Sequence, residues 1–182
     1  MEIETPEQPM QWFAMRDLKR HNAKEPAYRM LAGLGFEVYT PMTRRLTVKA
    51  GRRNWKEVPY MQDLLFVHAT REALDPVVAK TPTLQYRFLR KTFREPMTVP
   101  HEEMERFMQA VKSSSAPRYY RPEELTPAMY GRTVRIIGGP LNGCEGALLS
   151  LRGSRYKRIL VELPDILTVA VEVQPEVIEL LP

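Results

Sequence analysis

The opening third of the chain alternates between hydrophobic patterns typical of a strand and of a helix. Residues 11–16, QWFAMR, alternate with the period of two that a half-buried strand requires. In NAKEPAYRMLAGLG, apolar residues recur at i, i+3, i+4 and i+7 starting from Ala27, which predicts an amphipathic helix. Asn22 is expected to cap the start of this helix, and Gly33 or Gly35 is expected to end it.

Strand and helix patterns continue to alternate as far as residue 111. Strands are expected in FEVYTP, LLFVHA and LQYRFL, and helices in REALDPVVAK and PHEEMERFMQAV. The segment RRLTVKAGRRNWKEVP has β-prone flanks around AGRRN, a pattern that indicates a hairpin. The order β-α-β-β-α-β with a closing helix predicts an α+β fold in which helices cover one face of a sheet.

The remainder of the chain carries no helical pattern. Five short β-prone runs, RTVRII, GALLSL, RILVEL, LTVAVEV and EVIELL, are broken by Gly, Pro, Asn or Asp. Such spacing predicts a small all-β barrel, closed or partly open. The stretch SSSAPRYYRPEELTP has the composition of a flexible linker. We therefore expect a first domain over residues 1–112, a linker over 113–126 and a barrel over 127–182.

Positive charge is concentrated in the first domain. The chain has 27 Lys and Arg against 22 Asp and Glu, a net charge of +5, and its pI is near 9.4. Residues 1–112 hold 19 basic and 14 acidic side chains, whereas residues 113–182 hold 8 of each. The excess indicates a polyanionic partner without establishing one, because many basic proteins bind nothing acidic.

The sequence shows no pattern typical of an enzyme or a cofactor site. Cys144 is the only cysteine, so an intrachain disulfide is impossible, and the three histidines lie far apart. We find no glycine-rich phosphate loop and no acid and base paired at motif spacing. The chain begins without a signal-peptide pattern and has no apolar run of membrane-spanning length. We expect a cytoplasmic monomer without catalytic activity, cofactor, metal or membrane contact.

A glycine-rich turn opens the predicted barrel. The stretch VRIIGGPLNGCEGAL, residues 134–148, resembles the KOW motif. Gly138 and Gly139 permit backbone angles closed to other residues, and Gly146 allows two strands to pack closely. These roles are structural, so partner contacts are expected from the side chains around the glycines.

The resemblance extends over nearly the whole chain. QWFAMR, the first helix, GFEVYTP, the basic hairpin, VPYMQDLLFV and the late helix are similar in order and spacing to the ferredoxin- or RNP-like N-terminal domain of NusG-type transcription elongation factors. Within that superfamily, EPMTVPHEEMERFMQAV and the segment lengths are most similar to the UpxY antiterminators of capsular polysaccharide operons. The resemblance implies a factor that binds the clamp helices of RNA polymerase and disfavours pausing and termination.

The same resemblance implies a polymerase-binding set in the first domain. The positions that match the family's apolar patch are Trp12, Phe13, Tyr39, Pro41, Met61 and Leu64. Core packing is the alternative for each, because alternation along a strand turns about half of its side chains inward. Phe66 is expected in the core. Gln62 and Asp63 stand where most family members have Pro-Gly, so the turn before this strand is expected to differ.

The hairpin is the leading candidate for nucleic-acid contact. Its six cations precede the first acid, Glu57, and are Arg44, Arg45, Lys49, Arg52, Arg53 and Lys56. Trp55 lies among them as a candidate stacking residue. In related factors this side of the domain faces upstream or non-template DNA, and nascent RNA is another candidate; the alternative is a solvated charged loop. A second basic group, whose alternative role is to keep an edge strand soluble, is Arg87, Arg90, Lys91 and Arg94.

The predicted barrel has a candidate partner loop of its own. In NusG the KOW domain recruits a ribosomal protein or the termination factor Rho through the loop before the last barrel strands. The matching loop here is LPDILTV, which makes Ile166 and Leu167 the expected anchors unless both are buried. The competing hypothesis is a KOW-containing RNA- or ribosome-binding protein, which shares the barrel and the basic charge but does not need the first domain.

Overall fold

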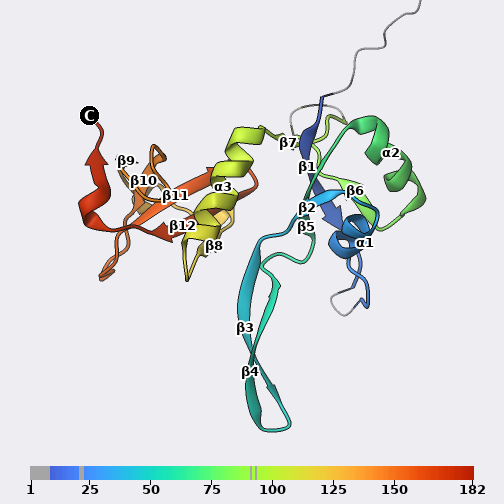
Figure 1. The fold of residues 1–182 in the computed structure, drawn as a ribbon, viewed down its shortest axis with the longest axis horizontal. Helices are drawn as coiled ribbons and strands as arrows, with labels where there is room; N and C mark the ends of the chain where they lie inside the picture. The colour runs from blue at the N-terminus through green and yellow to red at the C-terminus, as the bar shows by residue number, and fades with distance from the viewer. Residues whose placement is uncertain (1–8, 21–22, 91, 93) are drawn as a thin grey trace, which may run out of the picture. The chain divides into compact units, whose positions relative to one another are not determined.

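The computed structural model describes residues 9–20, 23–90, 92 and 94–182. The chain divides into two compact units, residues 1–100 and residues 101–182 (Figure 1). Within the described part, no helix has both the length and the apolar character that crossing a membrane requires.

The first unit is built around an antiparallel sheet. Its strands are β1 (Gln11–Asp17), β2 (Glu37–Tyr39), β5 (Leu64–Ala69), β6 (Leu84–Tyr86) and β7 (Thr98–Val99). The order is β2-β5-β1-β6, and β7 also pairs with β1. Since β5 lies antiparallel between β1 and β2, those two strands run parallel to each other, as in a split β-α-β unit. The predicted α+β class and strand–helix order are confirmed.

Two helices cover one face of this sheet. They are α1 (Ala27–Gly33) and α2 (Arg71–Lys80). Leu31 from α1 and Leu74 from α2 are fully buried in one cluster with Phe13, Met15 and Val67 from the strands. Full burial of a large apolar side chain contributes about 1.5–3 kcal/mol. This cluster is therefore a main source of the unit's stability.

The carboxylate of Asp17, at the end of β1, caps α1 from outside the helix. Its Oδ2 accepts a hydrogen bond from the N–H of Ala27 at 2.7 Å, and its Oδ1 accepts one from the N–H of Lys19 at 2.9 Å. The first N–H groups of a helix have no partner within it, so Asp17 satisfies one of them. The expected cap, Asn22, lies outside the described residues. The helix ends at Gly33, as predicted.

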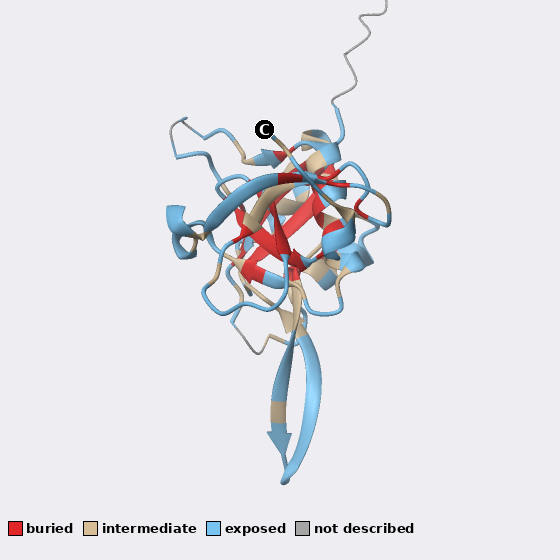
Figure 2. Cartoon of the chain, turned by 90° about the vertical axis from the view of Figure 1, so that its left-hand side faces the viewer, coloured by how far each residue is buried: buried red, intermediate tan, exposed pale blue. Residues whose placement is uncertain are grey.

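The predicted hairpin is confirmed as a separate two-stranded sheet. Its strands are β3 (Met42–Lys49) and β4 (Arg52–Pro59). Ala50 and Gly51 join them with φ values of +49° and +74°, and positive φ at both positions is what a two-residue type I′ turn requires. Between Arg44 and Glu57 every residue except Thr47 is exposed, which Figure 2 shows as the pale blue ribbon of the hairpin.

The second unit contains a six-stranded sheet and a helix. Its strands are β8 (Arg118–Tyr120), β9 (Tyr130–Ile136), β10 (Glu145–Leu149), β11 (Arg158–Leu163), β12 (Leu167–Glu172) and β13 (Ile178–Leu180). Short 3-10 turns occur at Pro122–Glu124, Pro127–Met129 and Pro175–Val177. The sheet order is β13-β9-β10-β11-β12-β8, with β13 and β8 at its two ends. The five predicted strands are all present, and the sheet is open rather than closed.

The boundary between the two units lies earlier in the chain than the sequence indicates. Helix α3 (His101–Ser113), expected to close the first domain, packs on β11 and β12 of the second unit. Residues 113–126, expected as a linker, include β8, which pairs with β12 and buries Tyr119. An amphipathic pattern identifies the apolar face of a helix but not the sheet that the face covers. The observed boundary therefore lies between residues 100 and 101, and not at the expected residues 112 and 126.

The glycines of the turn between β9 and β10 have the structural roles expected of them. Gly138 and Gly139 have φ values of +85° and +67°, a region that other residues rarely occupy. At Gly146 a Cβ atom would collide with the backbone oxygen of Leu160 on the neighbouring strand. The side chain of Asn142 also stabilises the turn, because its Oδ1 accepts a hydrogen bond from the N–H of Gly138 at 2.6 Å.

Candidate nucleic-acid interface

The register of the hairpin places four of its six cations on one face. In an antiparallel pair, residues directly opposite each other point to the same side. Arg45 lies opposite Lys56, and Lys49 lies opposite Arg52. Between these two pairs lie Thr47 and Asn54, which carry no charge. We call Arg45, Lys49, Arg52 and Lys56 the cationic face of the hairpin; it contains no acid.

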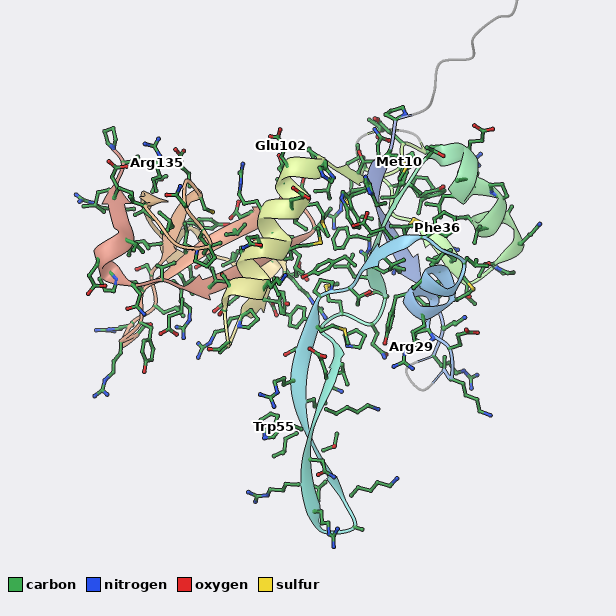
Figure 3. All side chains as sticks on the ribbon, in the orientation of Figure 1. Met10, Arg29, Phe36, Trp55, Glu102 and Arg135 are labelled. Atoms are coloured by element: carbon green, nitrogen blue, oxygen red, sulfur yellow. The ribbon has the colours of Figure 1, made fainter. Side chains whose placement is uncertain are left out.

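The opposite face of the hairpin combines aromatic and apolar side chains with charged ones. Leu46 pairs with Trp55, and Val48 pairs with Arg53. Trp55 is 63% exposed and Val48 is 66% exposed, and Figure 3 shows the Trp55 side chain projecting from the hairpin. The guanidinium carbon of Arg44 lies 5.8 Å from the centre of the Trp55 ring, within reach of a cation–π contact. Arg44 and Arg53 therefore lie on the same face of the hairpin as Trp55, opposite the cationic face.

The charge arrangement of the cationic face does not help the hairpin to fold. Like charges placed directly opposite each other on neighbouring strands are destabilising. Both cation pairs, Arg45 with Lys56 and Lys49 with Arg52, have this arrangement. A polyanion laid along the face would offset the repulsion, and nucleic-acid phosphates are bound through such lysines and arginines. The geometry therefore favours a phosphate-binding surface.

Arg87, which belongs to the second basic group, forms hydrogen bonds within the first unit. Its Nη2 donates to Asp63 Oδ2 at 3.0 Å and to the Asp63 carbonyl at 3.3 Å, while Nε donates to the Met15 carbonyl at 3.4 Å. Burial lowers the pKa of Arg87, and the nearby Asp63 carboxylate opposes that shift. Arg16 also lies 3.5 Å from Asp63. Asp63 thus joins β1, β5 and the segment after β6. Lys91 of this group lies outside the described residues.

The six expected polymerase-binding residues do not share one environment. Phe13 is 1% exposed and belongs to the cluster beneath α1 and α2, which matches the alternative of core packing. Trp12 and Leu64 lie on the opposite sheet face with Phe66, and all three are buried, as is Pro41. Tyr39 and Met61 are partly exposed. The burial expected of Phe66 is confirmed.

Trp12 is oriented by a histidine on the neighbouring strand. Its ring stacks on His68 at 4.8 Å between ring centres, with the planes 13° apart. The Nδ1 atom of His68 lies 2.8 Å from Glu37 Oε2. The Nε1 atom of Trp12 is buried and has no hydrogen-bond partner among the described residues. A buried donor without an acceptor costs about 1–3 kcal/mol, so this N–H lowers the stability of the first unit.

The expected partner loop of the second unit presents no exposed apolar anchor. Ile166 and Leu167 are both buried, which is the alternative that the sequence left open for them. Alternation does not distinguish them from exposed residues, because β12 is buried along nearly its whole length. Cys144 is also buried, and burial raises the pKa of its thiol, which disfavours the reactive thiolate.

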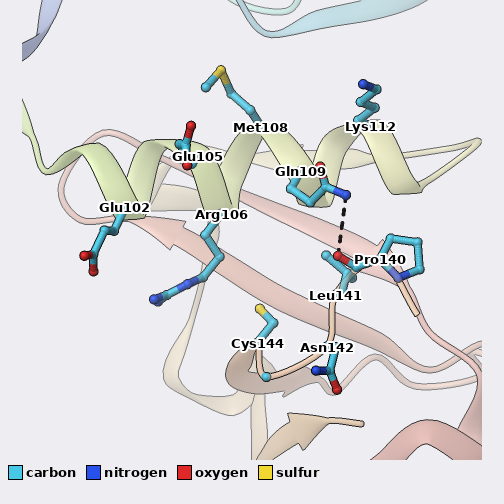
Figure 4. Close-up of a pocket in the computed structure, with 11 residues that line it drawn as sticks. Glu102, Glu105, Arg106, Met108, Gln109, Lys112, Pro140, Leu141, Asn142 and Cys144 are labelled. Carbon is cyan, nitrogen blue, oxygen red and sulfur yellow. Dashed lines mark hydrogen bonds between the residues drawn. The ribbon is translucent and has the colours of Figure 1, made fainter. Parts of the chain in front are cut away.

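A cavity of about 720 Å³ lies between α3 and the glycine-rich turn (Figure 4). Gln109 Nε2 donates across it to the carbonyl of Pro140 at 3.5 Å. Its charged lining combines Glu102 and Glu105 with Arg106 and Lys112. Because two acids and two bases line it, the cavity favours no ligand of a single charge.

The balanced charge of residues 113–182 conceals a second basic run. Four of the eight cations in this region fall within seven residues and are Arg152, Arg155, Lys157 and Arg158. No acid lies among them, and Tyr156 is exposed. Summing charge over a whole domain hides this run, whereas counting charge over windows of about eight residues would have found it.

Taken together, the fold and the hairpin define an α+β protein with a surface suited to nucleic-acid phosphates. The sequence model described as "Transcription termination factor nusG" matches residues 10–108, more than half of the chain. The chain therefore belongs to the NusG family, whose members are non-enzymatic transcription elongation and antitermination factors that bind RNA polymerase and nucleic acids.

A solved structure described as "Domain interaction in Thermotoga maritima NusG" is similar to this chain at 13% sequence identity and a TM-score of 0.45. The similarity covers 96% of this chain and 98% of that one. No curated protein matches the chain.

Proposed function

We propose that this protein binds RNA polymerase through its first unit and suppresses pausing or termination of transcription. The observation that carries the proposal is the family match over residues 10–108, which includes the whole sheet of the first unit and both helices that cover it. The finer assignment is to antiterminators of the UpxY type acting in a polysaccharide operon. It rests on the resemblance of residues 95–111 and on the segment lengths.

The polymerase contact is assigned to the sheet face opposite α1 and α2. Neither of these helices contributes a residue to the face that holds Trp12, Tyr39 and Leu64, because both pack in the cluster around Phe13. Tyr39 is partly exposed at this face and suits an apolar partner, whereas Trp12 and Leu64 are buried. Met61, in the turn before β5, borders this face and is partly exposed.

Co-purification tests the polymerase contact and separates it from the competing function. Core polymerase subunits are expected with the parent chain and not with Met61→Asp, because a charge buried in an apolar contact is left desolvated and unpaired. Leu34→Asp, which changes an exposed leucine after α1, is the matched control and is expected to retain polymerase. Recovery of ribosomal RNA without polymerase would instead favour a KOW-containing RNA- or ribosome-binding protein.

The cationic face of the hairpin is assigned to DNA or RNA in the elongation complex. Replacing Arg45, Lys49, Arg52 and Lys56 by Ser is expected to reduce terminator read-through while leaving polymerase co-purification intact. Each cation that binds a phosphate should add about 0.7–0.9 to the slope of log affinity against log salt, so the slope should fall by about 3 if all four bind. The measurement is affinity for a forked DNA duplex across a salt series, alongside read-through.

The control for this variant removes the same charge elsewhere. The four matched cations are exposed and distant in sequence from the hairpin, namely Lys24, Arg29, Lys80 and Lys112. Their replacement by Ser should leave the slope nearly unchanged. An equal change of slope in both variants would show that only total charge matters. Parental read-through in the hairpin variant would show that the hairpin is a solvated charged loop. Transcript profiling with and without the protein tests the polysaccharide operon.

A further inference from the structure

The loop between β10 and β11 combines basic and aromatic side chains at the surface of the second unit. Residues 152–157 are all exposed, and they include Arg152, Arg155 and Lys157. None of these three cations has an ion-pair partner among the described residues. Tyr156, between two of them, is 58% exposed. We call residues 151–157 the basic loop.

Hydrogen bonds hold the basic loop in a defined conformation. The N–H of Ser154 donates to the carbonyl of Leu151 at 3.2 Å, and Gly153 supplies the positive φ of +80° inside that turn. The hydroxyl of Ser154 donates to the carbonyl of Tyr156 at 3.0 Å. The carbonyl of Lys157 accepts from the N–H of Val173 at 3.0 Å, which joins the loop to the end of β12. The backbone carrying Tyr156 is therefore fixed on both sides.

A buried arginine lies behind the exposed tyrosine. The guanidinium carbon of Arg158 is 5.8 Å from the centre of the Tyr156 ring, and the Arg158 side chain is only 8% exposed. Its Nη2 lies 3.8 Å from Glu172 Oε2, a long ion pair, and its Nε has no hydrogen-bond partner among the described residues. Arg158 therefore orients the ring by a cation–π contact and leaves part of its positive charge unneutralised beneath the loop.

We propose that the basic loop is a second nucleic-acid site, specific for single strands, with one base stacked on Tyr156 and phosphates bound by Arg152, Arg155 and Lys157. Stacking platforms flanked by cations bind single strands because every unpaired base offers an aromatic face. A base inside a duplex is already stacked on both sides, so an isolated tyrosine gains little there. An acidic peptide would satisfy the cations but would not use the exposed ring.

The site does not depend on the hairpin, because it lies in the other unit and uses different residues. Its test therefore uses the full chain in two backgrounds, the parent and the variant in which the cationic face of the hairpin is replaced by Ser. The probes are a fluorescent single-stranded RNA of about 12 nucleotides, the same sequence as single-stranded DNA, and the DNA duplex, a length chosen to match the footprint of one small single-strand module.

Removal of the ring is expected to weaken single-strand binding. Tyr156→Ala should reduce affinity by about 5- to 150-fold, which corresponds to the loss of one stacked base. Tyr156→Phe keeps the aromatic face and is expected to bind as the parent does. Tyr130→Ala, which removes another partly exposed tyrosine of the same unit, is the control and should have no effect. The loss of affinity caused by Tyr156→Ala should be the same in the parent background and in the background with the replaced hairpin cations.

Removal of the cations is expected to change the salt dependence instead. Arg152, Arg155 and Lys157 replaced together by Ser should lower the slope of log affinity against log salt by about 2 for a single strand. The matched control replaces Arg118, Arg121 and Arg132, three exposed cations of the same unit, and should change the slope much less. The tighter of the RNA and DNA probes identifies which single strand the loop prefers.

Several results would overturn the proposal while leaving the hairpin assignment untouched. These are parental affinity in Tyr156→Ala, an equal change of slope in the two triple variants, or a preference of the loop for duplex over both single strands. Conversely, a loop effect that persists when the hairpin variant shows no defect would reject the hairpin site and keep this one.

Discussion

The central sheet of the first unit and the β3–β4 hairpin are neighbouring parts of one chain in opposite environments. In the sheet, the central opposing pairs of β1 and β5 are apolar and buried, for example Phe13 with Val67. In the hairpin, opposing residues include Arg45 with Lys56, and both are exposed. The two regions have the same antiparallel backbone, so the difference lies in what their side chains contact.

This difference separates side chains that stabilise the fold from side chains that are accessible to a partner. Burial constrains the sheet, because every large side chain there fills space that would otherwise be a cavity. The hairpin has no such constraint, and an isolated two-stranded hairpin is only marginally stable in water. Its repeated like-charge pairs are not explained by stability, and the polyanion contact proposed above would offset their repulsion.

The largest expected effect compares one aromatic residue from each region. Phe13→Ala is expected to lower the free energy of unfolding by about 3–5 kcal/mol, because it opens a cavity beneath α1 and α2. Trp55→Ala removes an even larger side chain and should cost less than about 0.5 kcal/mol, since Trp55 is exposed. The free energy of unfolding of both variants is measured by denaturant unfolding. Similar losses would mean that the hairpin is part of the folded core.

A smaller effect is expected from one carboxylate in each region. Asp63→Ala leaves the half-buried guanidinium of Arg87 without its ionic partner and should cost about 1–2 kcal/mol, below the range for fully buried charged hydrogen bonds because Asp63 is partly exposed. Glu57→Ala, opposite Arg44 in the hairpin, should cost no more than about 0.5 kcal/mol. Thermal unfolding at low and high salt checks both values. The prediction fails if Glu57→Ala destabilises the protein as much as Asp63→Ala does.

The smallest expected effect is a pH dependence that arises in the first unit. Hydrogen bonds from Arg71, and from the hydroxyl of Tyr86 at 2.6 Å, hold the pKa of Asp75 below its usual range. A lowered folded-state pKa stabilises the protein above the unfolded-state value, near pH 4, and this contribution is lost as pH falls through the folded-state pKa. It should amount to a few tenths of a kcal/mol, because solvent screens this partly exposed carboxylate.

Asp75→Asn is the variant that isolates this contribution. Melting temperatures of the parent and of Asp75→Asn should differ at pH 7 and approach each other toward pH 3. A gap that stays constant over this range would show that the Asp75 interactions do not depend on its charge.

The periodic patterns determined the elements of this protein. Alternation in QWFAMR and LLFVHA, and the helical spacing from Ala27, predicted β1, β5 and α1 at nearly the observed residues. The flanks of AGRRN predicted the hairpin, and the glycine spacing around Gly146 predicted a close approach between strands. These features are local, because backbone conformation and side-chain periodicity depend on residues a few positions apart.

Only the tertiary structure decided which elements and side chains meet. The hairpin register separated Arg44 and Arg53 from the four residues of the cationic face, and long-range packing placed α3 on β11 and β12. An ion pair with Asp63 removed Arg87 from the candidate surface, and a buried Arg158 lies against the ring of the exposed Tyr156. Charge and hydrophobicity identify residues able to form contacts. The contacts themselves depend on distances between residues remote in the chain, which no local pattern encodes.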